Sequence, residues 1–461
     1  MNKVRSIIAA IALMSVAMPI AAQHTASGYF TDGYLYRHEM NPAIANEQSY
    51  VAMPGISNLN VAMRSNIGVK DVLFNRNGRT TTFLNPNVSV ADAMSGINDI
   101  NKTNVDVKVQ ILGVGFKAFN GYNHVAINAR ANVATIIPRS LFSLAKEGVE
   151  NKSYDISDFK AHADAYTEIA LGHSHKINDK LNIGATLKII LGGANVDAEF
   201  NKAQLTLQDD AWQAVTNAKI QASIKGLKYE EETKMRGAEG QEIPHTYIKD
   251  VDVKNTGLNG FGLGLDLGAE YKLDDSWKFS AAFLDLGFIS WSNNMVASTN
   301  GDRSFTTDTY LFNVDKDADN KFSREMDRMT EGLAKLYELQ DNGDKGSRTT
   351  GLAATMNLGV EYTLPTYQDL SFGLLNTTRI HGKYSWTDFR LSANWHTGKL
   401  FSTGLTFGAG TYGASFGWIL NLHPNGFNFY LAMDHTLGKL AKQGVPLSGN
   451  GHVNLGINFP F

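Results

Sequence analysis

Three aspartates spaced two residues apart, Asp315, Asp317 and Asp319, resemble the opening of a calcium-binding loop. Calcium takes several hard oxygen ligands, and carboxylates at the first, third and fifth positions of a turning chain supply them. The sixth position, however, is Asn320 rather than glycine, and the twelfth is Met326 rather than glutamate. A solvated acidic loop is therefore the stronger interpretation, and we predict no cofactor and no functional metal site.

Two histidines, His173 and His175, flank one serine. In a strand both side chains would share one face, which is the geometry of a metal pair. They lie at the end of a predicted strand beside a turn, so a structural role at the rim is the favoured interpretation. The sequence shows no nucleophile elbow and no glycine-rich phosphate loop between a strand and a helix, so we do not expect an enzyme.

Eight charged residues form a third set, at single positions in segments that otherwise alternate between apolar and small or polar residues. Each basic member would cost about 2 to 4 kcal/mol if it faced the middle of a lipid bilayer. We therefore predict that all eight face the lumen of a barrel, either as a salt-bridged interior or as a polar path for a solute. They are Lys108, Arg130, Glu168, Lys188, Asp266, Glu270, Glu361 and Arg390.

The elements that would position these charges are strands, because a two-residue period dominates the chain from residue 50 onward. Phe261, Leu263, Leu265 and Leu267, for example, alternate with glycines and Asp266. The pattern predicts about fourteen strands, an even number as a closed bacterial barrel requires. The predicted ranges are 50–62, 104–119, 124–135, 163–176, 181–200, 258–273, 277–291, 352–364, 370–383, 386–396, 401–408, 414–422, 427–435 and 451–461.

The connections between these strands fall into two classes. Short turns such as Asn120-Gly121 and Asp274-Asp275 follow even-numbered strands. Long insertions follow odd-numbered strands, near residues 63–103, 136–162, 201–257, 292–351 and 436–450, and contain amphipathic helical segments such as 322–340. Short turns on one rim and long loops on the other are typical of outer-membrane barrels, whose long loops are extracellular. A soluble β-sandwich, the weaker alternative, has no reason to sort its loops.

One predicted strand breaks the alternation. Leu284 and Asp285 fall on the wrong faces of the segment that ends at Trp291. Glycine in a strand commonly marks a bulge or a close approach of the backbone. We therefore predict a strand kink at Asp285 and Gly287.

The first residues have the order of a secretory signal: Lys3 and Arg5, an apolar run to Ile20, and small residues up to Ala22. We expect a signal peptide over 1–22. No later apolar run reaches the roughly 18 to 20 residues of a membrane helix, so an exported chain that spans a membrane must do so with strands. The 461 residues contain no cysteine, carry a net charge of −3 and show no basic cluster, so nucleic acid is excluded as a partner.

The last ten residues form a two-faced strand whose apolar side ends in Phe459 and Phe461. This segment resembles the terminal strand of bacterial outer-membrane barrels, in which a final phenylalanine is part of the insertion signal. The resemblance implies contact with the barrel-insertion machinery and with outer-membrane lipid. It also implies the outer membrane of a Gram-negative bacterium as the location.

Asn41-Pro42-Ala43, just before the first strand, resembles the amino-terminal segment of the long-chain fatty-acid transporter family. The longer run from Asp32 to Ala43 resembles an uncharacterised Bacteroidetes-type family of outer-membrane barrels, itself related to barrels of the gliding and type IX secretion systems. These resemblances imply a plug formed by residues 23–49 at the periplasmic end of a barrel over 50–461.

Two functional hypotheses remain. The first is passive transport of a small hydrophobic or amphipathic solute across the outer membrane. The second is a structural or assembly barrel that anchors surface or periplasmic partner proteins of a secretion or surface complex. A continuous apolar cavity from the loops to Asn41-Pro42-Ala43 would favour transport, and a lumen filled by side chains would favour an anchor.

Overall fold

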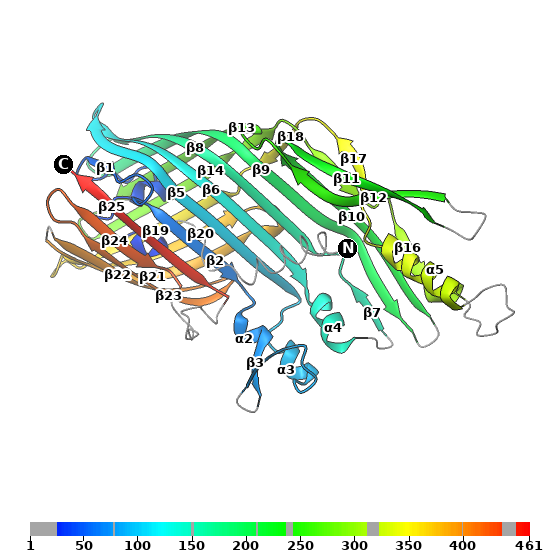
Figure 1. The fold of residues 1–461 in the computed structure, drawn as a ribbon. Coiled ribbons are helices and arrows are strands. Elements are labelled where there is room, and N and C mark those ends of the chain that lie inside the picture. Colours follow the sequence, from blue (N-terminus) through cyan, green and yellow to red (C-terminus); the bar gives the residue numbers. More distant parts are fainter. Residues whose placement is uncertain are drawn as a thin grey trace.

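The computed structural model describes residues 25–76, 79–148, 152–208, 211–236, 243–310, 322–398, 400–435 and 449–461. Its main element is one antiparallel sheet whose fourteen wall strands close into a barrel (Figure 1). The first wall strand consists of β1 (Tyr50–Ala52) and β2 (Leu59–Ser65), and both parts pair with β25 (Gly451–Pro460) to complete the cylinder. The structure thus confirms the fold that the two-residue period predicts.

The other wall strands follow each other in chain order around the barrel. They are β5 (Ile100–Ala118), β6 (Gly121–Pro138), β8 (Lys160–Lys176), β9 (Leu181–Leu207), β13 (Gly260–Lys272), β14 (Trp277–Trp291), β19 (Ala354–Thr363), β20 (Leu370–Ile380), β21 (Trp386–Thr397), β22 (Phe401–Gly410), β23 (Gly413–Leu422) and β24 (Asn428–Met433).

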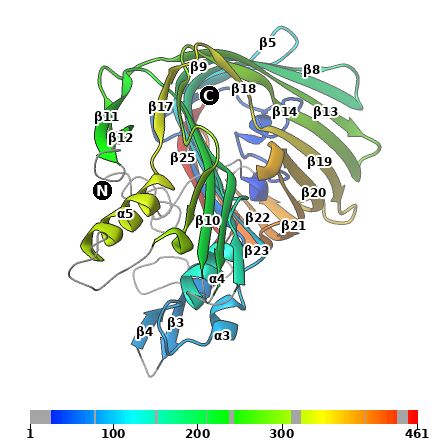
Figure 2. The same cartoon turned by 90° about the vertical axis from the view of Figure 1, so that its right-hand side faces the viewer.

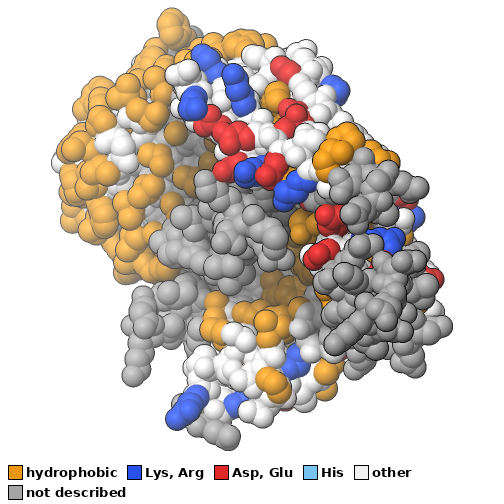
Figure 3. All heavy atoms as spheres, turned by 45° about the vertical axis from the view of Figure 1, so that its right-hand side comes forward, with side chains coloured by type: hydrophobic (Ala, Val, Ile, Leu, Met, Phe, Trp, Pro, Cys, Tyr) orange, Lys and Arg blue, Asp and Glu red, His pale blue; other side chains and the backbone are white. Residues whose placement is uncertain are grey.

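The two faces of the wall have opposite chemistry. Phe261, Leu263 and Leu267 on β13 are 54%, 41% and 43% exposed, whereas Asp266 between them is buried inside. Figure 3 shows apolar side chains covering the outer wall and charged side chains gathered near one end. An apolar band outside and polar groups inside is the arrangement that a strand barrel needs in lipid.

The barrel has two unlike ends. At one end, here called the turn end, short connections join β5 to β6, β8 to β9, β13 to β14 and the later pairs up to β23 and β24. The opposite end, here called the loop end, carries the long insertions, and the wall from β5 to β14 extends further there than the wall from β19 to β25 (Figures 1 and 2). Two connections at the loop end are nevertheless short, at residues 381–385 and 411–412.

The insertions contain more strand than the sequence indicated. β9 continues to Leu207, beyond the predicted end at Phe200, because β10 (Trp212–Ile224) pairs with it. Short strands prolong the sheet further: β7 (Lys152–Asp155), β15 (Met295–Ser298), β16 (Arg303–Thr306), β17 (Gln340–Asp344) and β18 (Arg348–Gly351). Two hairpins stand apart, β3 (Leu73–Arg76) with β4 (Arg79–Thr82) and β11 (Leu227–Arg236) with β12 (Ile243–Val253).

Helices are few and lie in the insertions. The α-helices of the described residues are α2 (Val69–Val72), α3 (Val90–Met94), α4 (Arg139–Glu147) and α5 (Phe322–Lys335), and the 3₁₀ turn η3 (Thr307–Thr309) also lies in an insertion. Among the residues described, no helix combines the length and the apolar character needed to cross a membrane.

The first wall strand is interrupted at residues 53–58, where the sequence predicted one continuous strand. Ala52 pairs with Asn458 and Leu59 with Leu455. Between these two pairs the first strand therefore contains more residues than β25 does. Asn58 accepts a backbone hydrogen bond from Gln110 at 3.1 Å, and Ile56 accepts one from Ile457 at 3.1 Å, so the excursion stays bonded to both neighbours. Pro54 and Gly55 break the strand pattern there, as both residue types disfavour strand interiors.

Candidate functional site: the plugged lumen

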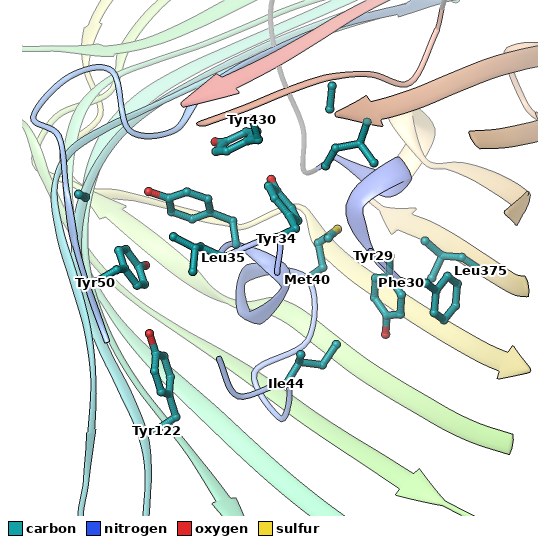
Figure 4. Close-up of a cluster of buried hydrophobic side chains, with 14 residues drawn as sticks. Tyr29, Phe30, Tyr34, Leu35, Met40, Ile44, Tyr50, Tyr122, Leu375 and Tyr430 are labelled. Atoms are coloured by element: carbon teal, nitrogen blue, oxygen red, sulfur yellow. The ribbon is translucent and has the colours of Figure 1, made fainter. Parts of the chain in front are cut away.

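The segment 25–49, here called the hatch, lies inside the barrel. It contains the short 3₁₀ turns η1 (Ala26–Gly28) and η2 (Arg37–Glu39). Tyr29, Tyr34, Tyr36 and Met40 are at most 2% exposed. Figure 4 shows Tyr29, Tyr34 and Met40 packed against residues of the inner wall, which include Tyr50, Tyr122, Leu375 and Tyr430, and Tyr36 belongs to the same cluster. The lumen of this barrel is therefore occupied by its own amino-terminal chain.

The inward-facing apolar residues of the wall mark the contact with the hatch. Ile419 breaks the alternation of β23 because it points inward, and it is fully buried. It packs, with Leu375 and Ala432, in the same cluster as the hatch tyrosines. Apolar residues on a polar face are thus the sequence signal that would have located the hatch on the wall.

The beginning of the hatch is held by a carboxylate. Asp434, just beyond β24, accepts hydrogen bonds from the backbone N–H groups of Ala26 and Ser27, each at 2.8 Å. The Ser27 hydroxyl also donates to Asp434. On the other side, Asn454 of β25 donates to the Thr25 hydroxyl. Sequence analysis did not single out Asp434, because the partners lie about 400 residues apart.

Tyrosine hydroxyls join the hatch to β5 and β25, the two neighbours of the interrupted first strand. The Tyr36 hydroxyl lies 2.6 Å from Gln110 Oε1 and 2.7 Å from Asn458 Oδ1. Asn454 donates to the Tyr34 hydroxyl at 3.0 Å. Burial raises the pKa of Tyr34 and of Tyr36, so both hydroxyls keep their protons.

The Asn41-Pro42-Ala43 motif sits on a pair of wall glycines. Asn41 Oδ1 accepts the Ala43 N–H at 3.0 Å, and Asn41 Nδ2 donates to the Ala269 carbonyl at 3.1 Å. Gly184 and Gly268 face each other across β9 and β13. A Cβ on Gly184 would stand 2.1 Å from the Pro42 oxygen, and one on Gly268 2.1 Å from Asn41 Oδ1. Only glycine lets the motif approach the wall this closely.

The middle of the hatch makes an ion pair with the wall. Glu39 Oε1 lies 2.6 Å from Lys108 Nζ, and both side chains are at most 10% exposed. Asn58 Nδ2 donates to the other Glu39 oxygen at 2.8 Å. Near the turn end, Arg37 pairs with Asp32 at 2.6 Å. Burial would raise the pKa of Asp32, but the charges of Arg37, Lys278 and His396 together outweigh burial and lower it.

A network of charges joins five successive wall strands, β6, β8, β9, β13 and β14, on the loop-end side of the hatch, and its hub is Asp285. Arg130 donates to both oxygens of Asp285, at 3.0 and 3.2 Å, and Lys188 Nζ lies 2.6 Å from Asp285 Oδ1. Glu168 accepts from Arg130 at 3.1 Å, and Asp266 lies 2.8 Å from Lys188. Five acidic and basic side chains are thus brought together, four of them from the set predicted to be lumenal.

Asp285, the hub of the network, lies in a β-bulge of β14. The register between β13 and β14 shifts between Leu265 and Leu267, opposite Leu284 and Asp285. Asp285 has φ of 57°, in the left-handed region, and its N–H donates to Asp266 at 2.7 Å. The structure places this bulge at Leu284 and Asp285, whereas Gly287 pairs regularly with Gly264. The bulge points two successive side chains inward, which explains the break in the alternation.

The remaining members of the lumenal set have separate partners. Glu361 pairs with Lys278 at 3.1 Å, and Arg390 pairs with Asp388 at 2.6 Å and donates to the Asp434 carbonyl at 3.1 Å. Glu270 lines a small cavity between the hatch and the wall. The eight charges therefore all face the interior, but they form several clusters and not one continuous path.

The cavities of the described lumen are small. One of about 20 Å³ is lined by Asp106, Arg130, Asp164 and Arg379, and another of about 20 Å³ by Arg64, Trp386, Arg390 and the hatch residue Met40. A third, of about 10 Å³, lies between Tyr29 and Glu270. A single water needs roughly 10 to 15 Å³ by this measure, so each cavity has room for one or two waters.

The other candidates from the sequence lie away from the hatch. The rings of His173 and His175 are 5.8 Å apart at the turn end, and His173 is hydrogen-bonded to Asn123 at 2.9 Å. In the part of the chain that is described, no cluster of histidine, cysteine and acidic side chains has the geometry of a metal site. Asp315, Asp317 and Asp319 lie outside the described residues, as does the expected signal peptide.

The terminal aromatic residues lie at the turn-end rim. Phe459 pairs with Val51, and both Phe459 and Phe461 are exposed, at 43% and 76%. The Phe461 N–H donates to the Ser49 carbonyl at 2.9 Å. The insertion signal predicted from the sequence is therefore accessible at the seam where the barrel closes.

Comparison with solved structures gives likenesses of low similarity. The Pseudomonas putida toluene transporter TodX has 9% identity, a TM-score of 0.41 and coverage of 95% of both chains. The Ralstonia pickettii toluene transporter TbuX has 9% identity, a TM-score of 0.41 and coverage of 97% of both chains. A Pseudomonas aeruginosa FadL homologue has 11% identity, a TM-score of 0.35 and coverage of 96% of this chain and 97% of its own.

No curated protein matches the chain. A family model matches residues 42–434. This range begins at Pro42, the second residue of the Asn-Pro-Ala motif, and contains the charge network and all of the wall from β1 to β24. The chain therefore belongs to DUF5723, a family of unknown function.

Proposed function

We propose that this protein is a gated channel of a Gram-negative outer membrane, which lets a small hydrophobic or amphipathic solute pass when the hatch moves. The observation that carries the proposal is the nature of the hatch. It fills the lumen but contributes no strand to the wall, so it can leave without opening the cylinder. The polar side chains that line the cavities favour an amphipathic solute over a purely apolar one.

The contacts of the hatch also fit a movable element. Many of them are hydrogen bonds between neutral side chains, in which Asn454 donates and Asn458 and Gln110 accept. Water can replace such bonds, and each is worth only about 0.5 to 1.5 kcal/mol net when neutral. The apolar part of the contact is concentrated in the tyrosine cluster of Figure 4, which sets the main cost of release.

A second function, a structural barrel that anchors partner proteins, is favoured by one observation. The three cavities described above have room for no more than one or two waters each, and none of these three is an apolar tunnel. A barrel with a permanently filled interior would serve as a membrane anchor, with its rim or insertions as the contact surface.

Solute flux separates the two functions. Purified full-length protein and a variant without residues 23–46 would be reconstituted in liposomes at equal density. The panel of solutes would include a sugar, a short-chain carboxylic acid and an aromatic hydrocarbon. We expect greater flux through the shortened protein, with the largest increase for the carboxylic acid. Equal and negligible flux in both would overturn transport and favour the anchor, and a folded monomer that is soluble without detergent would overturn both.

A further inference from the structure

Opposite walls of the barrel touch each other at the loop end. The turn between β20 and β21, residues 381–385 with the 3₁₀ turn η4 (Gly382–Tyr384), lies across the lumen from β5, β6 and β8. Around the fourteen-strand wall, β20 and β5 are half a circumference apart. A turn that reaches strands on the far side must cross the interior.

Five pairs make up this contact, here called the cross-lumen contact. The rings of His381 and His162 have centroids 4.9 Å apart, and the Lys383 ammonium lies 3.3 Å from Asp158. Lys102 Nζ donates to the Ser385 carbonyl at 3.3 Å. One level deeper, Arg379 lies 3.4 Å from Asp106, and the Arg64 guanidinium stacks 4.7 Å above the ring centre of Trp386.

The wall side of the contact is held firmly. His162 Nδ1 lies 2.6 Å from Asp197 Oδ1, and His162 Nε2 lies 3.0 Å from Asp164 Oδ2. Arg348 of β18 also contacts Asp197. The His162 ring is therefore fixed on both nitrogens, by Asp164 of its own strand β8 and by Asp197 of the neighbouring β9, and it presents a rigid surface to the turn.

The turn side is bonded less completely. Within the described residues, His381 Nδ1, Trp386 Nε1 and Arg379 Nε are buried but make no hydrogen bond. The one ion pair at the tip, Lys383 with Asp158, is about 60% exposed on both sides, and such pairs are worth about 0 to 1 kcal/mol. If the walls part, water can satisfy the unbonded groups, and the Arg379–Asp106 pair is the buried ion pair of the contact that must separate.

We propose that the cross-lumen contact is a second gate, separate from the hatch and in series with it. The two small polar cavities lie between these closures: Arg379 lines one, and Arg64 and Trp386 line the other together with Ala26 and Met40 of the hatch. A solute from the loop end would meet the turn first and the hatch second. This inference rests on the proposed channel function. It adds to that function the side chains that control the entry of a solute from the loop end.

Single cysteines in the cysteine-free full-length chain test the gate without measuring transport. Thr377, two residues deeper than Arg379 on β20, lines the cavity beside Met40, and Thr377→Cys changes its volume little. Ser153→Cys on exposed β7 serves as the reference. Intact cells would be treated with a membrane-impermeant thiol reagent, and the labelling rate at each position measured.

The first gate variant replaces the four residues 381–384 with the dipeptide Asn-Gly, which favours a two-residue hairpin turn. The shorter turn keeps Ser385 opposite Ile380, so the pairing of β20 with β21 is retained. Tyr384→Ala is a milder second variant. We expect labelling at Thr377→Cys to be slow in the parent and to rise by on the order of tenfold in both variants, because labelling follows the open population. Ser153→Cys should not change. Lys202→Ala, which breaks a loop-end ion pair with Asp302 that does not cross the lumen, should leave both rates unchanged.

Two results would overturn the second gate: labelling at Thr377→Cys as fast in the parent as at Ser153→Cys, or a rate that neither turn variant changes. Gel mobility with and without heating would confirm that each variant still forms the barrel. Failure of the channel function itself shows separately in the liposome flux, since the labelling experiment reports only access to the lumen.

Discussion

The backbone N–H of Ser27 donates to the carboxylate of Asp434 at 2.8 Å. The first residues of the hatch are in this way bonded to the end of the penultimate strand. Asp434 is completely buried, and it also binds the N–H of Ala26. A buried carboxylate that accepts several donors at a chain segment is a strong point of attachment, because each bond is charge-assisted. This attachment is the first target for releasing the hatch.

Asp434→Asn should loosen the beginning of the hatch. The amide can accept only through one oxygen and carries no charge, and a hydrogen bond to a charged group is worth about 1.5 to 3 kcal/mol. Hydrogen exchange at the amides of residues 26 to 28 should become faster by one to two orders of magnitude, roughly as that energy implies. Asp179→Asn, in an exposed turn, is the control. Unchanged exchange would show that Asp434 does not hold the hatch.

The Glu39–Lys108 pair should behave as a buried pair in a double-mutant cycle. Glu39→Gln or Lys108→Met alone leaves one buried charge without its partner and should cost about 3 to 5 kcal/mol of stability. The double variant should cost less than the sum, and the cycle can be measured by thermal denaturation in detergent. The exposed Lys272–Asp275 pair should show a coupling of about 0 to 1 kcal/mol. Equal coupling in both cycles would contradict the buried attachment.

Gly184→Ala should displace the Asn41-Pro42-Ala43 motif. The new methyl group would stand 2.1 Å from the Pro42 oxygen, so the hatch must shift. Overpacking of this kind costs about 1 to 3 kcal/mol, and protease should cut the hatch more readily. Gly351→Ala is the matched control, since a Cβ there meets nothing within 4 Å. A hatch equally resistant in both variants would show that the motif does not depend on this close approach.

The cross-lumen contact should weaken in acid. Burial and the nearby charges of His162 and Arg379 lower the pKa of His381 to about 4, although Asp164 and Asp197 oppose them. Once the turn is released, the pKa returns toward its ordinary value of about 6.5. The released state therefore binds more protons between these values, and docking is lost as the pH falls from about 6.5 to about 4.

Labelling of Thr377→Cys relative to Ser153→Cys measures this pH dependence, and the ratio corrects for thiol ionisation in the reagent step. The ratio should rise as the pH falls through this window, and His381→Gln should flatten the curve. Tyr384 also faces His381, with ring centroids 5.4 Å apart, but it stays neutral throughout this range. A ratio that is flat in the parent would exclude His381 as the acid-sensitive group.

The sequence predicted the wall well because its rules are local. Alternation along β13 and short turns such as Asn120-Gly121 depend on neighbouring residues only, and lipid enforces the pattern. Strand ends were less accurate where a distant partner decides them. β9 is longer than predicted because β10 pairs with it. The first strand is interrupted at residues 53–58, which include residue types that are common in loops.

The site was only partly predictable. The lumenal charges and the Asn41-Pro42-Ala43 motif stand out by type and position, and the misplaced Leu284 and Asp285 pointed to the bulge. Asp434, Gly184 and the turn at 381–385 gave no such signal. Their importance comes from contacts between residues hundreds of positions apart, which one sequence does not reveal.

The attachment of Thr25–Ser27 has a consequence for folding. Asp434 and Asn454, which bind these residues, lie just beyond β24 and on β25, the last two wall strands along the chain. Closing the cylinder and holding the start of the hatch therefore depend on the same two strands. Both require contacts between residues about 400 positions apart, and contacts of such high sequence separation are slow to form.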